Sequence, residues 1–60
     1  MGNPPLKVFI ADDSAVMRER FVTLIGEIEN AKIAGQAADA QQTIKEVRRT
    51  KPDVLLLDIR

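Results

Sequence analysis

The sequence contains no cysteine, no histidine, no tryptophan and no tyrosine, and its aromatic residues are two phenylalanines. Without cysteine there are no disulfide bonds, and without cysteine or histidine the usual zinc and haem ligands are absent. The chain also offers no aromatic platform on which nucleic-acid bases could stack. Because nine basic residues balance nine acidic ones, the overall charge does not favour binding to nucleic acid or to an anionic membrane.

Long hydrophobic runs are missing as well. The longest one, Val54-Leu55-Leu56-Leu57, is far shorter than the roughly 20 residues that span a bilayer. Residues 1–5 carry no basic cluster followed by an apolar stretch, so they do not resemble a signal peptide. We therefore expect no membrane segment and a cytoplasmic location. Sixty residues form one domain at most, and a domain of this size is marginally stable alone.

Three segments have the composition of β-strands. Pro4 and Pro5 exclude a helix or a central strand, so we expect residues 1–5 to be a lead-in and residues 6–60 to form the domain. Apart from Lys7, residues 6–11 are apolar at both odd and even positions, whose side chains point to opposite faces of a strand. This pattern is typical of a parallel strand that is buried on both faces. Residues 54–57 show the same pattern. Residues 31–38 are only weakly apolar, which indicates an edge strand.

The spacing of apolar residues predicts a helix over residues 15–28, with Ser14 as its N-cap. Its apolar face comprises Met17, Phe21, Leu24, Ile25 and Ile28. Gly26 inside this helix costs about 1 kcal/mol relative to alanine. Either a close approach to a strand or an earlier helix end would explain the glycine.

A second helix is expected to begin after Asp39 and to end before Pro52. Its apolar face comprises Ala40, Ile44 and Val47. The basic residues near its end suit the helix dipole, and we interpret them as a solvated helix end and not as a DNA-binding patch. They are Lys45, Arg48, Arg49 and Lys51.

The order strand, helix, strand, helix, strand indicates an α/β fold with parallel strands and right-handed crossovers. Placing the weakest strand at an edge gives the spatial order 2-1-3. The last strand then has no partner on its outer side, and an exposed apolar edge is a template for pairing. We expect either further protein or a second copy of the chain to pair with the segment 53–58.

Three carboxylates follow strands that should be neighbours. Asp12 and Asp13 follow the first strand and Asp58 follows the third, so the parallel arrangement places them at one edge of the sheet. Two carboxylates about 5 Å apart repel by roughly 3 kcal/mol at an effective dielectric of 20, and Mg²⁺ would relieve that repulsion. An aspartate beside such a metal can attack a phosphoryl group. Aspartate is also common at strand ends and helix starts as a cap, and the pattern alone leaves both interpretations open.

The segments 7–14, 34–40 and 51–60 together resemble the first half of the receiver domain of two-component response regulators. The resemblance implies half of a flavodoxin-like doubly wound parallel sheet. It implies that Asp58 is the phosphoacceptor and that a sensor histidine kinase is the donor. It also implies that Mg²⁺ is held by Asp13, by Asp12 partly through water, by Asp58, and by the main-chain carbonyl of Arg60.

The resemblance also shows what these sixty residues lack. The hydroxyl residue and the lysine that complete the family's site fall beyond Arg60, so the chain provides neither. Any enzymatic activity is at most Mg²⁺-dependent self-phosphorylation from a donor. A DNA-binding output domain is expected only elsewhere in a full-length protein. The alternative function is a structural half-domain that self-associates through its last strand and performs no chemistry.

Overall fold

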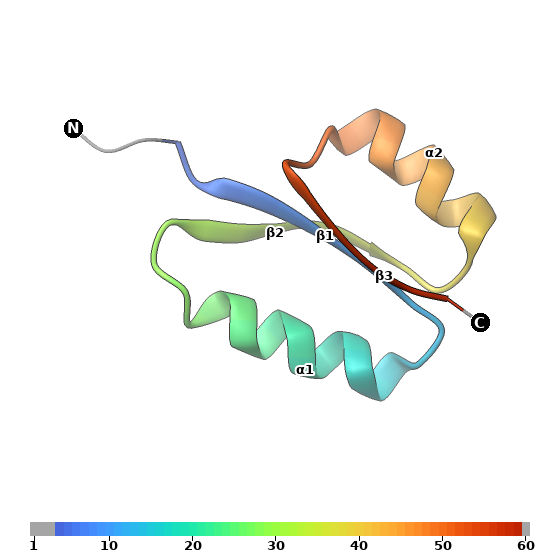
Figure 1. Ribbon diagram of the computed structural model, residues 1–60, viewed down its shortest axis with the longest axis horizontal. Coiled ribbons are helices and arrows are strands. Elements are labelled where there is room, and N and C mark those ends of the chain that lie inside the picture. The colour runs from blue at the N-terminus through green and yellow to red at the C-terminus, as the bar shows by residue number, and fades with distance from the viewer. Residues whose placement is uncertain (1–3, 60) are drawn as a thin grey trace.

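The structure, a computed structural model, describes residues 4–59 and contains three strands and two helices (Figure 1). The elements are β1 (Leu6–Asp12), α1 (Ala15–Gly26), β2 (Ala31–Ala37), α2 (Ala40–Thr50) and β3 (Val54–Asp58). All strands are parallel, in the order β2-β1-β3. The predicted element order, the 2-1-3 arrangement and the position of the second strand at an edge are confirmed.

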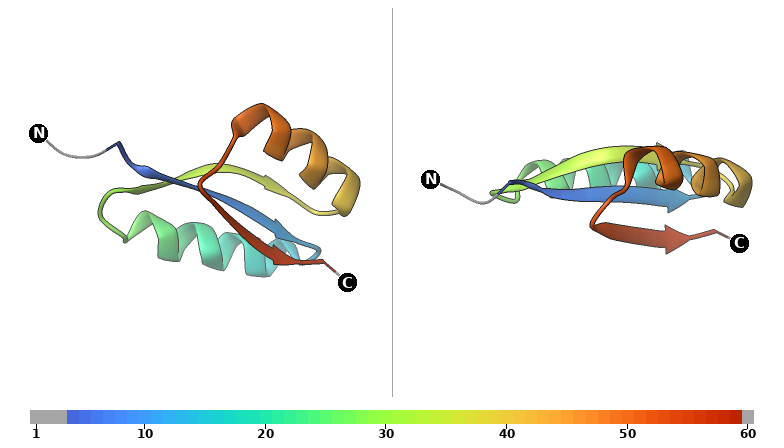
Figure 2. Two further views of the ribbon diagram at one scale, coloured as in Figure 1. Left: turned by 45° about the horizontal axis from the view of Figure 1, so that its top comes forward. Right: turned by 90° about the horizontal axis from the view of Figure 1, so that it is seen from above.

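The two helices lie on opposite sides of the sheet (Figures 1 and 2). Both pack against β1 and β2, and within residues 4–59 neither contacts β3. The central strand is therefore covered from both sides, and residues 8–11 are buried, as predicted. On β3, by contrast, Leu55 is 42% exposed and Leu57 is 64% exposed. The third strand thus has neither a neighbouring strand on its outer side nor a helix over its faces within the described residues.

A close contact between β1 and β2 organises the small core. Phe9 has no exposed surface, and a Cβ atom added to Gly35 would lie 2.8 Å from Cε2 of its ring. The strand register shifts at this point, because Val8 pairs with Ile33 whereas Phe9 pairs with Gly35. Glycine therefore leaves the space that the aromatic ring occupies. Ala11 and Ala37 are buried with Phe9 in one cluster, and Val47 and Ile59 pack against that cluster.

Helix α1 begins as predicted and ends earlier. The Ser14 hydroxyl accepts a hydrogen bond from the Met17 amide (3.3 Å), which confirms the N-cap. The helix ends at Gly26 and not at residue 28, and a Cβ atom at Gly26 would meet nothing within 4 Å. Close approach to a strand is therefore the wrong explanation for this glycine, and an early helix end is the right one. Ile28 lies beyond the helix and is 52% exposed, and Leu24 is 55% exposed, so neither belongs to the packed face.

Helix α2 is capped as predicted but turns a different face inward. The Asp39 carboxylate accepts a hydrogen bond from the Gln42 amide (2.8 Å). Val47 packs against the core as expected, whereas Ile44 is 56% exposed and Thr43 is buried. Thr43 can be buried because its hydroxyl donates to the Asp39 carbonyl (2.7 Å), and one helical turn separates it from Val47 on the same face.

Lys7 joins the start of β1 to the loop before β3. Its amide donates to an Asp53 carboxylate oxygen, and its carbonyl accepts from the Asp53 amide, both at 2.8 Å. Its ammonium group donates to the Thr50 carbonyl at the end of α2 (2.9 Å). These bonds fix where β3 starts beside β1 and therefore set the register at the other end of the strands. Among residues 4–59, no helix has the length and apolar character needed to cross a membrane.

Candidate functional site

Asp12 and Asp58 are directly paired at the carboxyl ends of β1 and β3. Neighbouring strands lie about 4.8 Å apart, and paired residues project from the same face of a sheet. Because side chains alternate along a strand, Asp12 projects from the face opposite to Phe9, which packs towards α2. Both aspartates therefore project from the face that α1 covers.

The Asp12 side chain is buried and only half satisfied. It is 2% exposed, and its Oδ1 atom accepts a hydrogen bond from the Ser14 amide (2.8 Å). Its Oδ2 atom is buried without a hydrogen-bond partner among the described residues. Leaving a buried acceptor unpaired costs about 1–3 kcal/mol. An oxygen in this state fits a site that receives a cation.

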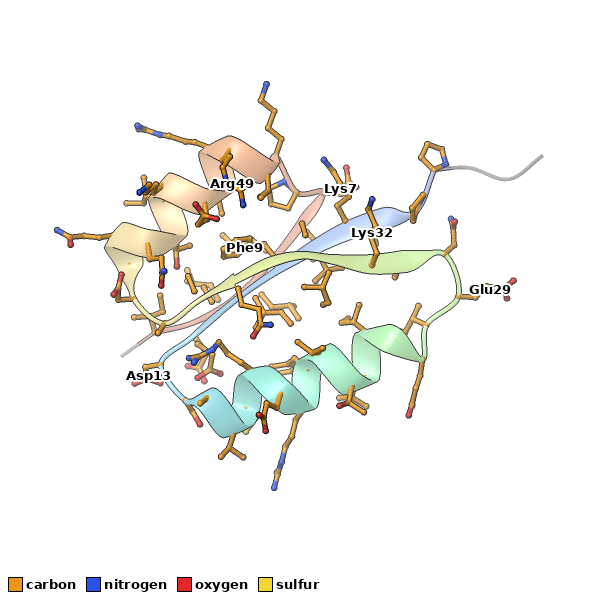
Figure 3. All side chains as sticks on the ribbon, turned by 180° about the vertical axis from the view of Figure 1, so that it is seen from behind. Lys7, Phe9, Asp13, Glu29, Lys32 and Arg49 are labelled. Carbon is orange, nitrogen blue, oxygen red and sulfur yellow. The ribbon has the colours of Figure 1, made fainter. Side chains whose placement is uncertain are left out.

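Asp13 and Asp58 form the solvent-exposed part of the site. Asp13 lies in the turn between β1 and α1. Figure 3 shows it at the end of the molecule opposite to Glu29, Lys7 and Lys32. The carboxylates of the site are thus separated from these lysines by the length of the strands.

The structure brings together two of the residues that the sequence analysis proposed as metal ligands. Asp12 and Asp58 lie side by side, but no group of three acidic, histidine or cysteine side chains within residues 4–59 is arranged to hold a metal ion. The Arg60 carbonyl lies outside the described residues. Since Mg²⁺ commonly keeps several water ligands and binds through one or two carboxylates, the pair and its unpartnered oxygen fit this ion. Convergence of all three aspartates stays a prediction.

Arg18 is a site residue that the sequence analysis did not identify. Its Nη1 atom donates to the main-chain carbonyl of Asp12 at 2.6 Å, so a guanidinium group from α1 reaches the end of β1. The spacing of residues along the sequence does not indicate this contact, because it crosses the turn that joins β1 to α1.

Comparisons with known proteins agree with this geometry. A sequence model described as the response regulator receiver domain matches residues 8–60. The chain is 36% identical over 93% of its length to protein-glutamate methylesterase/protein-glutamine glutaminase 1 of Syntrophomonas wolfei, and it covers 16% of that protein. It is 31% identical over 92% of its length to response regulator GacA of Pseudomonas syringae, covering 26% of it. No solved structure gives a significant match.

The chain thus spans between about a sixth and a quarter of the length of these two relatives. The matched region, residues 8–60, contains both paired aspartates and extends over most of the sixty residues. The chain belongs to the response regulator receiver domain family, whose members act in two-component signalling.

Proposed function

We propose that Asp58 accepts a phosphoryl group from a phosphohistidine of a sensor histidine kinase, and that the reaction requires Mg²⁺. The observation that carries this proposal is the pairing of Asp58 with Asp12, whose buried Oδ2 atom has no partner among the described residues. Asp12, Asp13 and Asp58 are the proposed side-chain ligands of the ion, and the main-chain carbonyl of Arg60 is a further ligand.

The residues divide the chemistry between them. A carboxylate oxygen of Asp58 attacks phosphorus, the bond between phosphorus and the donor imidazole nitrogen breaks, and that nitrogen keeps the electron pair. An acyl phosphate forms on Asp58. Mg²⁺, when bound, neutralises negative charge on the phosphoryl oxygens. Asp12 provides the fixed, buried end of the site because its Oδ1 atom is held by the Ser14 amide.

The proposal also covers the setting of this reaction. Residues 6–60 are the first half of a receiver domain and residues 1–5 are a lead-in. The hydroxyl residue and the lysine that complete the site follow Arg60 in a longer chain. The proposed location is the cytoplasm, and output is proposed to be the task of other segments of a full-length protein, where a DNA-binding domain is expected.

Phosphorylation is tested on a longer form of the chain that contains the rest of a receiver domain. A small acyl phosphate serves as donor, with and without Mg²⁺, and peptide mass spectrometry locates the label. We expect Mg²⁺-dependent labelling of Asp58 that is lost in Asp58→Asn. Asp53→Asn is the matched control, because Asp53 lies on the loop at the opposite end of β3. Absence of label with Mg²⁺ present contradicts the proposal.

A second candidate function is self-association through residues 53–58. The exposure of Leu55 and Leu57, together with the absence of helix contacts to β3 within the described residues, favours it. Two copies that pair through β3 would form one continuous sheet, in which the open β3 edge of each copy is paired. In this case the chain is a structural half-domain without chemistry of its own.

A further inference from the structure

The contact between Arg18 and Asp12 places a cation beside the proposed metal site. Arg18 lies in the first half of α1 and is half-buried, and its Nη1 atom lies 2.6 Å from the Asp12 carbonyl oxygen. A guanidinium donor makes this a charge-assisted hydrogen bond, which is stronger than one between neutral groups. The atom it holds belongs to the peptide group that joins Asp12 to Asp13.

The direction of this carbonyl follows from the alternation of backbone groups along β1. The Leu6 amide donates to Asn30, next to β2, whereas the Lys7 carbonyl accepts from Asp53, next to β3. In a parallel sheet, the backbone groups of successive residues in a central strand therefore form hydrogen bonds to opposite neighbouring strands. Asp12 has the parity of Leu6, so its carbonyl is directed towards the β2 side of the strand.

No residue of β2 pairs with Asp12. The last pair between these strands is Ala11 with Ala37, after which the chain turns towards α2. Arg18 thus supplies the hydrogen-bond donor that β2 no longer offers. Because Asp58 pairs with Asp12 from β3, the guanidinium holds Asp12 from the side opposite to the proposed phosphoacceptor.

We propose that Arg18 is a positioning residue for the metal site. By fixing the peptide group between Asp12 and Asp13, it holds the Asp12 Oδ2 atom and the Asp13 carboxylate in the relative placement that Mg²⁺ requires. This inference rests on the proposed function, since it assumes that these carboxylates bind the ion.

Electrostatics and positioning make opposite predictions for the loss of Arg18. Removing a positive charge near a cation site strengthens cation binding by Coulomb's law alone. Removing a residue that orients metal ligands weakens it, typically by 10-fold to about 100-fold. A fall in Mg²⁺ affinity therefore reports lost positioning.

The experiment is a Mg²⁺ titration of the chain, followed through the amide NMR resonances of Asp13 and Ser14. Arg18→Gln is expected to weaken binding roughly tenfold. Arg20→Gln, which removes the same positive charge from an exposed arginine of the same helix, is expected to leave the affinity unchanged. Replacing Arg18 with citrulline, which is feasible by chemical synthesis, removes the charge but keeps one Nη amide group as a donor, so affinity should equal or exceed that of the wild type.

The outcomes separate this inference from the proposed function. If the wild type binds Mg²⁺ and Arg18→Gln binds it equally or more tightly, the positioning role is wrong and the metal site stands. If Arg18→Gln does not fold, Arg18→Met takes its place, and equal or tighter Mg²⁺ binding by that variant overturns the inference. Failure of the wild type to shift these resonances with Mg²⁺ removes the metal site and the inference together.

Discussion

Asp12 and Asp58 lie opposite each other where the paired strands β1 and β3 end, and they differ in exposure. Asp12 is 2% exposed, whereas Asp58 is exposed. One carboxylate is therefore held in the protein interior and the other remains accessible to a phosphate donor. This asymmetry suits a division of roles in which Asp12 binds the ion and Asp58 reacts.

The first prediction concerns the exposed member of the metal site. Asp13→Asn is expected to abolish Mg²⁺ binding, because the amide carries no charge to offset dehydration of the ion. Asp39→Asn is the matched control, since asparagine caps a helix as well as aspartate does. Titration with Mg²⁺, followed by NMR, measures both. Equal affinity in the wild type and in Asp13→Asn would show that Asp13 is not a ligand.

Replacement by alanine is expected to change stability in opposite directions at Gly35 and Gly26. Gly35→Ala places a methyl group 2.8 Å from the Phe9 ring and should lower the free energy of unfolding by about 1–3 kcal/mol. Gly26→Ala meets no atom within 4 Å and should raise it by about 0.4–1 kcal/mol. Urea denaturation followed by circular dichroism measures both changes. A Gly35→Ala variant as stable as the wild type would mean that the ring does not need this space.

The bonds between Lys7 and Asp53 yield a stability prediction. Asp53→Ala removes the acceptor of the Lys7 amide and should lower the free energy of unfolding by about 1 kcal/mol. Asp53→Asn keeps a side-chain acceptor and should cost less than Asp53→Ala. Thermal unfolding of the two variants compares them, and equal losses would argue against this hydrogen bond.

The open edge of β3 predicts an oligomer. The chain is expected to sediment as a dimer or larger species, and Leu57→Lys should shift it to monomer because charged side chains block edge pairing. Leu24→Lys places the same charge at an exposed leucine of α1 and should leave the mass unchanged. A folded wild type with a monomer mass at every concentration would rule out self-association.

The sequence predicts the topology well because its signals are local and redundant. The weak apolar character of residues 31–38 places β2 at the edge, and Ser14 and Asp39 cap their helices as expected. That Asp12 and Asp58 lie at the same edge of the sheet follows from the strand order, whereas their direct pairing also depends on the register that the bonds between Lys7 and Asp53 set. The helix caps and the edge position of β2 are each set by a short stretch of chain.

Features that depend on three-dimensional packing were not predictable in the same way. The spacing of apolar residues in α2 predicts that Ile44 lies on the buried face, yet the structure buries Thr43 instead. The Thr43 hydroxyl forms its hydrogen bond at the start of the same helix, to the Asp39 carbonyl. The register shift beside Gly35 depends on the shape of the Phe9 ring. The contact from Arg18 to Asp12 depends on how α1 leaves the strand, which residue spacing does not encode.

The most direct test of the central claim is whether one cation senses positions 12, 13 and 58 together. Mn²⁺ accepts the same oxygen ligands as Mg²⁺, and it broadens the NMR signals of nearby nuclei. At low Mn²⁺ concentration, we predict that the amide signals of Asp12, Asp13 and Asp58 broaden together while that of Asp53 stays sharp. Broadening at Asp12 and Asp13 that is equally strong in an Asp58→Asn variant would contradict the shared site.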